Sequence, residues 1–275
     1  MFDSMEILDQ GSGPAVLCLH GFPQNMSAYD QIASQLVQAG LRVIRYNQRG
    51  YTRETSGGRR RDYTMSKLAA DAISVLDECD VESCIIVGHD LGATVAWEVE
   101  RAAPSRVVSL VIVGAPHPGA FILSLVSPRQ IASSWYFVLA QSTCLTKALY
   151  SPAKSGSRER LARFLEKSGL SASESQPYLD YLRAGNVFVG AVRWYQAMPF
   201  SPLRLAFFRT VKDVHIIVGG ADYFSGGLSI AFSRLFVSPG RLKVTRVDGG
   251  THWLLDQQPD VVAAAIVTQS HRDDR

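Results

Sequence analysis

The sequence predicts an α/β protein with a mostly parallel central sheet, and two patterns carry that prediction. Short apolar runs alternate with stretches of helical periodicity over residues 14–113, and the same rhythm returns over residues 214–269. Residues 119–205 break the rhythm, because they lack comparable apolar runs and are rich in aromatic side chains. We therefore expect a core of residues 1–118 and 206–275, with helices on both faces of its sheet, and a helical cap of residues 119–205 inserted into it.

The individual elements follow from the periodicity and its stop signals. Apolar residues at Ile32, Leu36 and Val37 lie on one face of a helix that Gly40 ends. Pro104 likewise stops a later helix. The expected strands are residues 14–20, 41–46, 84–88, 107–113, 214–218 and 242–247, and the expected core helices are residues 26–39, 65–79, 91–102, 228–236 and 259–269.

Composition narrows the class of protein. The chain has 275 residues, of which 47% are hydrophobic and 19% charged, and a formal net charge of +3. This mild balance argues against nucleic acid or an acidic membrane as partner, and no run approaches the roughly 20 apolar residues of a membrane span. The four cysteines form no C-x-x-C pair and no zinc module, and no signal peptide is evident. We expect a cytoplasmic protein without a metal or cofactor.

The segment Gly88-His89-Asp90-Leu91-Gly92 follows an apolar strand and precedes a helix. This layout predicts a nucleophile elbow, a tight turn that lifts one side chain above the edge of the sheet. Esterases place serine there, but an aspartate is already ionised at neutral pH. A fixed carboxylate can displace a leaving group from a saturated carbon, so Asp90 predicts the opening of an epoxide or the removal of a halide.

A supporting acid and base follow in the chain order that this elbow requires. Asp222 and His252 each come just after an expected strand, so both reach the rim where Asp90 sits. Asp222 would orient His252, which would activate water. Asp248 is a rival acid, but it lies only four residues before His252. The backbone N–H groups of Phe22 and Leu91 are the expected oxyanion donors.

Seven motifs along the chain resemble the epoxide hydrolase branch of the α/β-hydrolase superfamily. Together they span nearly the whole chain and imply the α/β-hydrolase fold. They are HGFPQ at 20–24, RYNQRGY at 45–51, GHDLG at 88–92, APHPGAF at 115–121, RWYQAMP at 193–199, GGAD at 219–222 and GGTHW at 249–253.

The resemblance also implies two cap tyrosines that hold the epoxide oxygen and donate a proton to it. Tyr136 is the expected first tyrosine and Tyr178 the expected second, with Tyr181 as its rival. Tyr195 is expected to serve in packing of the cap. The residues expected to line the substrate pocket are Trp135, Tyr181, Trp194 and Trp253.

Two residues depart from the family pattern. Asn47 stands where an aspartate is common, and Leu91 stands where a tryptophan is frequent, so the pocket loses an indole. A short N-terminus also predicts that the first edge strand is reduced or missing.

The expected function is hydrolysis of a small apolar epoxide by water, through an ester on Asp90. A haloalkane dehalogenase is the nearest alternative, but halide binding needs N–H donors such as an indole beside the nucleophile, and Leu91 has none. A pocket protein that binds a small molecule without turnover is the other alternative. The sequence does not decide between a monomer and a homodimer.

Overall fold

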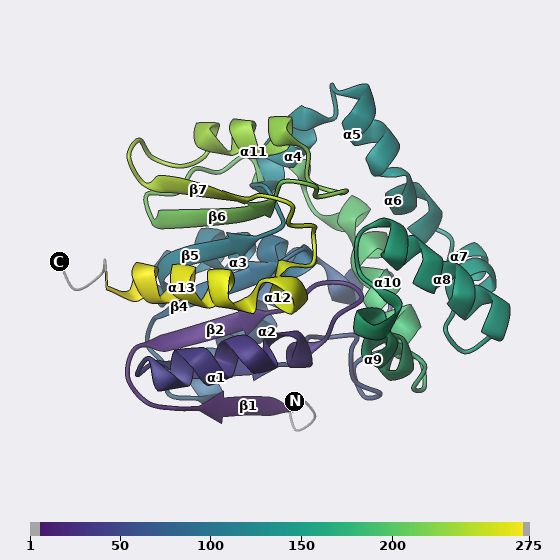
Figure 1. Cartoon of the computed structure of the whole chain (residues 1–275), viewed down its shortest axis with the longest axis horizontal. Coiled ribbons are helices and arrows are strands. Elements are labelled where there is room, and N and C mark those ends of the chain that lie inside the picture. Colours follow the sequence, from purple (N-terminus) through teal and green to yellow (C-terminus); the bar gives the residue numbers. More distant parts are fainter. Residues whose placement is uncertain (1–5, 272–275) are drawn as a thin grey trace.

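The computed structural model describes residues 6–271, and a seven-stranded sheet lies at its centre, in the order β1-β3-β2-β4-β5-β6-β7 (Figure 1). All neighbouring strands are parallel except β1, which runs antiparallel to β3. The strands are β1 (Ile7–Gln10), β2 (Ala15–Leu19), β3 (Arg42–Tyr46), β4 (Cys84–His89), β5 (Val107–Val113), β6 (Asp213–Gly219) and β7 (Leu242–Val247). The predicted α/β fold with a mostly parallel sheet is confirmed.

Burial explains why the inner strands are continuous apolar runs. Every residue of β4 is buried, because parallel strands at the centre of a sheet have helices on both faces. Helices α1 (Asp30–Gln38) and α13 (Pro259–Ser270) pack together on one face, while α2 (Met65–Glu78) and α3 (Leu91–Ala102) cover the other (Figure 1).

The first edge strand is short but present. The four residues of β1 pair with β3 from Ile7 opposite Tyr46 to Gln10 opposite Val43. The N-terminal segment thus protects the outer edge of β3 by supplying backbone hydrogen-bond partners.

Two expected helices each divide into two pieces. The helix expected at 26–39 begins as a 3-10 turn, η1 (Met26–Tyr29), before α1. The Asn25 side chain accepts the Ser27 N–H at that turn, which is the usual way to satisfy an orphan donor at a helix start. The helix expected at 228–236 becomes α11 (Gly227–Phe232) followed by η6 (Ser233–Leu235).

A helical segment connects β5 to β6 and lies beyond the carboxyl ends of the strands (Figure 1). Its first helix packs against α11 of the core, so the chain leaves the core only after that helix. The helices are α4 (Pro118–Ser124), α5 (Pro128–Ser133), α6 (Trp135–Ala140), α7 (Thr143–Tyr150), α8 (Ser155–Lys167), α9 (Ala172–Leu182), α10 (Val187–Ala197), η4 (Met198–Phe200) and η5 (Leu203–Ala206).

We call the helical segment from α5 to η5 the cap. Its helix α10 lies against the core through a close backbone approach. A Cβ atom on Gly190 would lie 2.3 Å from the carbonyl oxygen of Gly50, and one on Gly50 would lie 2.8 Å from that of Gly190. The indole of Trp194 donates to the Arg49 carbonyl oxygen over 2.7 Å. These contacts hold α10 against the loop that follows β3 and fix which of its side chains face the core.

Candidate active site

The turn between β4 and α3 has the geometry of a nucleophile elbow. Asp90 has a φ of 53° and a ψ of −121°, a conformation that a residue with a side chain rarely adopts. Close packing surrounds the turn, because a Cβ on Gly92 would lie 2.2 Å from the Leu19 carbonyl oxygen and one on Gly21 would lie 2.4 Å from the Asp90 Cβ. Glycine at these positions lets neighbouring backbone approach the elbow.

The Asp90 carboxylate lies against two backbone donors. The Phe22 N–H donates to its Oδ1 over 3.1 Å, and the Leu91 amide is its second backbone partner. Burial opposes ionisation, yet the contacts with His252 and the Leu91 amide hold the pKa of Asp90 below its ordinary value. Asp90 is therefore an anion at neutral pH, and the expected oxyanion donors, Phe22 and Leu91, lie beside it.

His252 and Asp222 complete the arrangement. The Nδ1 atom of His252 lies 3.0 Å from Oδ2 of Asp222, whose other oxygen accepts the N–H groups of Phe224 and Ser225 at 2.8 and 2.9 Å. The Nε2 atom of His252 lies 3.4 Å from Oδ2 of Asp90, an ion-pair contact that is long for a hydrogen bond. The structure thus brings together the three residues that the sequence placed after separate strands.

The two carboxylates decide the charge of His252. Burial alone would lower its pKa, but Asp222 and then Asp90 outweigh burial and raise the pKa of His252 to about 10. The free site therefore holds an imidazolium between two carboxylates, with Asp222 fixing which nitrogen faces Asp90.

The neighbouring histidines are neutral. Burial is the main cause that lowers the pKa of His20 and of His89 to about 4 each. The backbone N–H of Gln48 donates to Nε2 of His20 over 3.2 Å, and the His89 ring contacts the His252 carbonyl oxygen at 2.9 Å. Both side chains support the loops around Asp90 instead of carrying charge.

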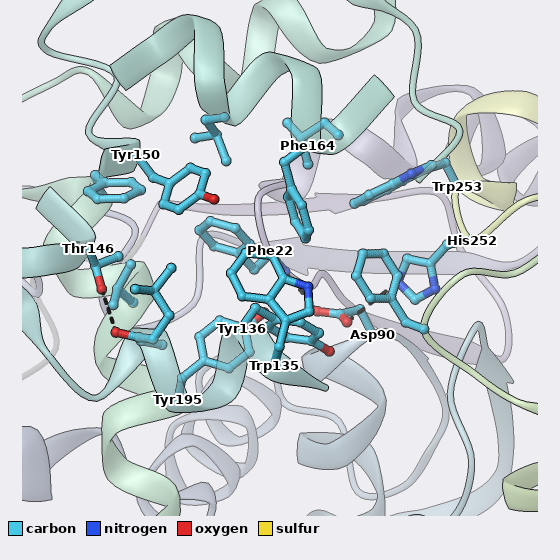
Figure 2. A pocket seen from close by; sticks show the side chains of 17 residues that line it. Phe22, Asp90, Trp135, Tyr136, Thr146, Tyr150, Phe164, Tyr195, His252 and Trp253 are labelled. Atoms are coloured by element: carbon cyan, nitrogen blue, oxygen red, sulfur yellow. Dashed lines mark hydrogen bonds and ion pairs between the residues drawn. The ribbon is translucent and has the colours of Figure 1, made fainter. Parts of the chain in front are cut away.

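Two tyrosines of the cap face Asp90, and only one of them was expected. Tyr136 and Tyr195 line the same cavity as the carboxylate, with their ring centroids 5.8 Å apart (Figure 2). Burial, followed by the Asp90 charge, raises the pKa of each well above its ordinary value. Both phenols are therefore protonated at neutral pH and can donate a proton or a hydrogen bond.

The expectation that Tyr178 or Tyr181 is the second tyrosine over Asp90 is wrong in its geometry. The Tyr178 hydroxyl donates to Oδ1 of Asp256, and that of Tyr181 donates to the Tyr51 carbonyl oxygen over 2.6 Å. Neither lines the cavity of Asp90. A helical spacing could have identified Tyr195, because Phe188, Val192 and Tyr195 follow i, i+4, i+7 on α10 and all three line the cavity.

The expected aromatic lining is also only partly present. Trp135 and Trp253 line the cavity, and the Trp253 indole donates to the Ser168 hydroxyl over 3.1 Å. Trp194 does not reach it, since it is fully buried between the cap and the core, with its ring stacked 6.0 Å from that of His20. Phe224, which the sequence did not single out, lines the cavity with its ring 4.8 Å from that of His252.

The cavity has two lobes that meet at Asp90, Tyr136, Phe224 and His252. The cap lobe runs between α6, α8 and α10 (Figure 2). The other lobe, of about 330 Å³, runs between α3, α4 and the end of the cap. Its walls are mostly apolar, and they include Leu91, Thr94, Pro116, Phe121, Phe137 and Met198. An apolar molecule held across the meeting point would place one of its carbons on the Asp90 carboxylate.

Residues 6–271 contain no cluster of three or more His, Cys, Asp or Glu side chains in an arrangement that could hold a metal ion. Over the same range, no helix combines the length and apolar character needed to cross a membrane.

Comparisons with known proteins agree with this architecture. The profile of the Alpha/beta hydrolase family matches residues 16–265. Epoxide hydrolase 3 of Mus musculus is 28% identical over 258 residues, covering 90% of this chain and 68% of its own. Epoxide hydrolase B of Mycobacterium tuberculosis is 35% identical over 113 residues, or 41% of this chain and 32% of its own.

A solved structure shows the same fold. The epoxide hydrolase of Bacillus megaterium in complex with an inhibitor superposes with a TM-score of 0.82 at 21% identity, covering 97% of this chain and 96% of the other. The match of the family profile to most of the chain establishes that this hydrolase belongs to the alpha/beta hydrolase family, and its sequence resembles the epoxide hydrolase branch.

Proposed function

We propose that the protein opens an apolar epoxide to a vicinal diol through a covalent ester on Asp90. The observation that carries the proposal is an ionised aspartate at the elbow, facing two protonated tyrosines across an apolar cavity and backed by His252 and Asp222. The names of the sequence relatives support hydrolysis of an epoxide.

Ring opening uses the carboxylate and the tyrosines. An Asp90 oxygen attacks one epoxide carbon, forming a C–O ester bond as the ring C–O bond breaks. The electron pair of the broken bond goes to the epoxide oxygen, which takes a proton from Tyr136 or Tyr195. A phenol is a suitable donor because an alkoxide is far more basic than a phenolate.

Ester formation then changes His252. The charge of Asp90 is one cause of the raised His252 pKa, and the ester no longer carries that charge. The pKa of His252 therefore falls in the intermediate, and its proton can replace the one that the tyrosine gave away. The neutral imidazole left behind is able to act as a base.

Hydrolysis completes the cycle. His252 takes a proton from water as the water oxygen attacks the ester carbonyl carbon, and the oxyanion accepts the N–H groups of Phe22 and Leu91. Collapse breaks the bond between the carbonyl carbon and the substrate oxygen, and that oxygen takes the remaining proton of the attacking water as the diol leaves. The carboxylate returns as an anion beside the His252 imidazolium, which restores the free site.

A single turnover in heavy-oxygen water tests the covalent step. With enzyme in excess over a simple aryl epoxide, the diol should contain ordinary oxygen that came from Asp90, and heavy oxygen should enter in later turnovers. Heavy oxygen in the first diol would mean direct attack by water and would refute the ester.

The His252→Gln variant offers a second test by mass spectrometry. It should accumulate protein whose mass is increased by one substrate molecule, whereas His252→Gln combined with Asp90→Ala should not. Labelling by chloroalkanes but not by epoxides would favour a dehalogenase, and tight binding without labelling or product would favour a binding protein.

A further inference from the structure

Helix α8 carries a row of exposed cations on one face. Arg160, Arg163 and Lys167 follow the spacing i, i+3, i+7, and all three are exposed. Within residues 6–271, none of the three forms an ion pair with a carboxylate. Positive charge is concentrated in this part of the chain. Residues 119–205 contain ten Lys and Arg against four Asp and Glu, while the whole chain has a net charge of only +3.

These cations line a surface hollow that adjoins the catalytic cavity. The hollow, of about 390 Å³, is bounded by the three cations and by Trp135, Tyr150, Phe164 and Tyr223. Trp135, Tyr150 and Phe164 also line the cap lobe of the Asp90 cavity (Figure 2). The same aromatic side chains thus have the nucleophile on their inner side and the cations on their outer side.

The two sides differ in what they can bind. The cap lobe is lined mainly by apolar side chains, and its one carboxylate, Asp90, would repel an anion placed beside it. The hollow outside offers two guanidinium groups and an ammonium group in contact with water. Guanidinium groups bind carboxylate, sulfate and phosphate oxygens in pairs, and clustered cations raise the local concentration of anions.

Building on the proposed epoxide hydrolysis, we propose that the preferred substrates are apolar epoxides with an anionic group at the end remote from the oxirane. The apolar body enters the cap lobe between Trp135, Tyr150 and Phe164, and its epoxide reaches Asp90. The anionic end stays in the hollow on Arg160, Arg163 and Lys167, where it keeps its contact with water. Neighbouring Glu166 does not line this hollow but the adjacent one, which shares Lys167 and Tyr223 with it and also contains Arg129.

A matched substrate series tests the proposal. The probes are epoxides of one chain length whose remote end is a carboxylate, a primary alcohol or a trimethylammonium group. At low ionic strength, kcat/KM should be about tenfold higher for the carboxylate than for the alcohol and lowest for the trimethylammonium compound. The preference should fall as salt is added, because exposed charges are screened.

Charge reversal locates the effect on α8. Arg160→Glu combined with Arg163→Glu should abolish the carboxylate preference through KM, leaving kcat and the alcohol substrate within about twofold. The control pair, Arg183→Glu with Lys243→Glu, makes the same change in net charge at exposed positions outside the hollow. The control should retain the preference, which would separate local contact from overall charge.

The outcomes distinguish this inference from the proposed function. Failure to form diol from every probe would refute epoxide hydrolysis itself. Equal hydrolysis of the three probes, or equal effects of the two variant pairs, would refute the anionic substrate while leaving epoxide hydrolysis intact. If charge reversal instead abolished binding to vesicles of phosphatidylcholine and phosphatidylglycerol and left the preference unchanged, the cations would serve a lipid surface and the inference would be wrong.

Discussion

Two partly buried aspartates at the same end of the sheet, Asp90 and Asp256, meet tyrosines of the cap in opposite ways. Asp90 faces Tyr136 and Tyr195 across a cavity, while Asp256 accepts a direct hydrogen bond from Tyr178. The pKa of Asp90 is lowered, whereas burial raises the pKa of Asp256 to about 6. The difference lies in their surroundings, because His252 supplies a positive charge beside Asp90 and the partners of Asp256 are neutral.

The comparison contrasts the proposed nucleophile, Asp90, with a carboxylate, Asp256, that connects segments of the fold. Asp256 also accepts the Gln24 amide over 2.6 Å, and Gln24 lies just beyond Phe22, whose N–H donates to Asp90. Asp256 itself lies in α12 (Leu254–Gln257), just beyond His252, and Tyr178 lies in α9 of the cap. This junction therefore ties together three of the segments that surround the cavity, without entering it.

The largest expected difference between the two aspartates is in catalysis. Asp90→Ala should reduce the rate of diol formation by at least about a thousandfold, because it removes the proposed nucleophile and no other group at the elbow replaces it. Asp256→Asn should lower kcat by less than about tenfold, since it acts only through the position of its neighbours. An Asp90→Ala protein that still opens epoxides at the original rate would refute the assignment.

The next largest effects on the rate are expected from substitutions of the cap tyrosines. Tyr136→Phe and Tyr195→Phe should each slow the opening of the epoxide by about ten- to a hundredfold, because each removes one of the two proposed proton donors, and the double variant should lose more. Pre-steady-state measurement of ester formation provides the readout. Tyr181→Phe is the matched control, because its hydroxyl binds the Tyr51 carbonyl oxygen outside the cavity. If Tyr195→Phe behaves like this control, the second donor lies elsewhere.

The pH dependence of stability should report on Asp256. Its pKa in the folded protein, about 6, exceeds the ordinary value of 3.8, so its contribution stabilises the fold below about pH 4 and is lost as the pH rises through 6. Relative to Asp256→Asn, the wild-type protein should lose about 2 to 3 kcal/mol of unfolding free energy between about pH 4 and pH 7. Denaturant titrations of both proteins across this range measure the difference, and parallel curves would contradict the raised pKa.

The smallest expected effect belongs to Tyr178. Tyr178→Phe removes one of the two side-chain donors to Asp256 and should cost about 1 to 2 kcal/mol of unfolding free energy at neutral pH. The rate of ester formation should change by less than about threefold, since the hydroxyl does not face the cavity. A loss of ring opening as large as that of Tyr195→Phe would show that Tyr178 reaches the substrate after all.

Local pattern was enough to predict the core and the elbow. The succession of strands and helices along the chain follows from the apolar runs, and parallel strands bring their carboxyl ends to one edge of the sheet. Asp90 follows the end of β4 directly, and Asp222 and His252 lie in the short loops after β6 and β7, so the strand ends bring all three residues to one edge. The first edge strand was expected to be reduced or missing, and the structure has it in the reduced form, because β1 is only four residues long.

The cap was predicted as a set of helices, but only the tertiary structure decided which of its aromatic residues face Asp90. Trp194 and Tyr195 are adjacent on α10, about 100° apart around the helix axis, so one packs on the core and the other enters the cavity. The close contact of Gly190 with Gly50 sets that rotation. The Tyr178 hydroxyl binds Asp256, 78 residues away in the chain, and does not face Asp90. No local sequence pattern predicts a pairing over such a distance.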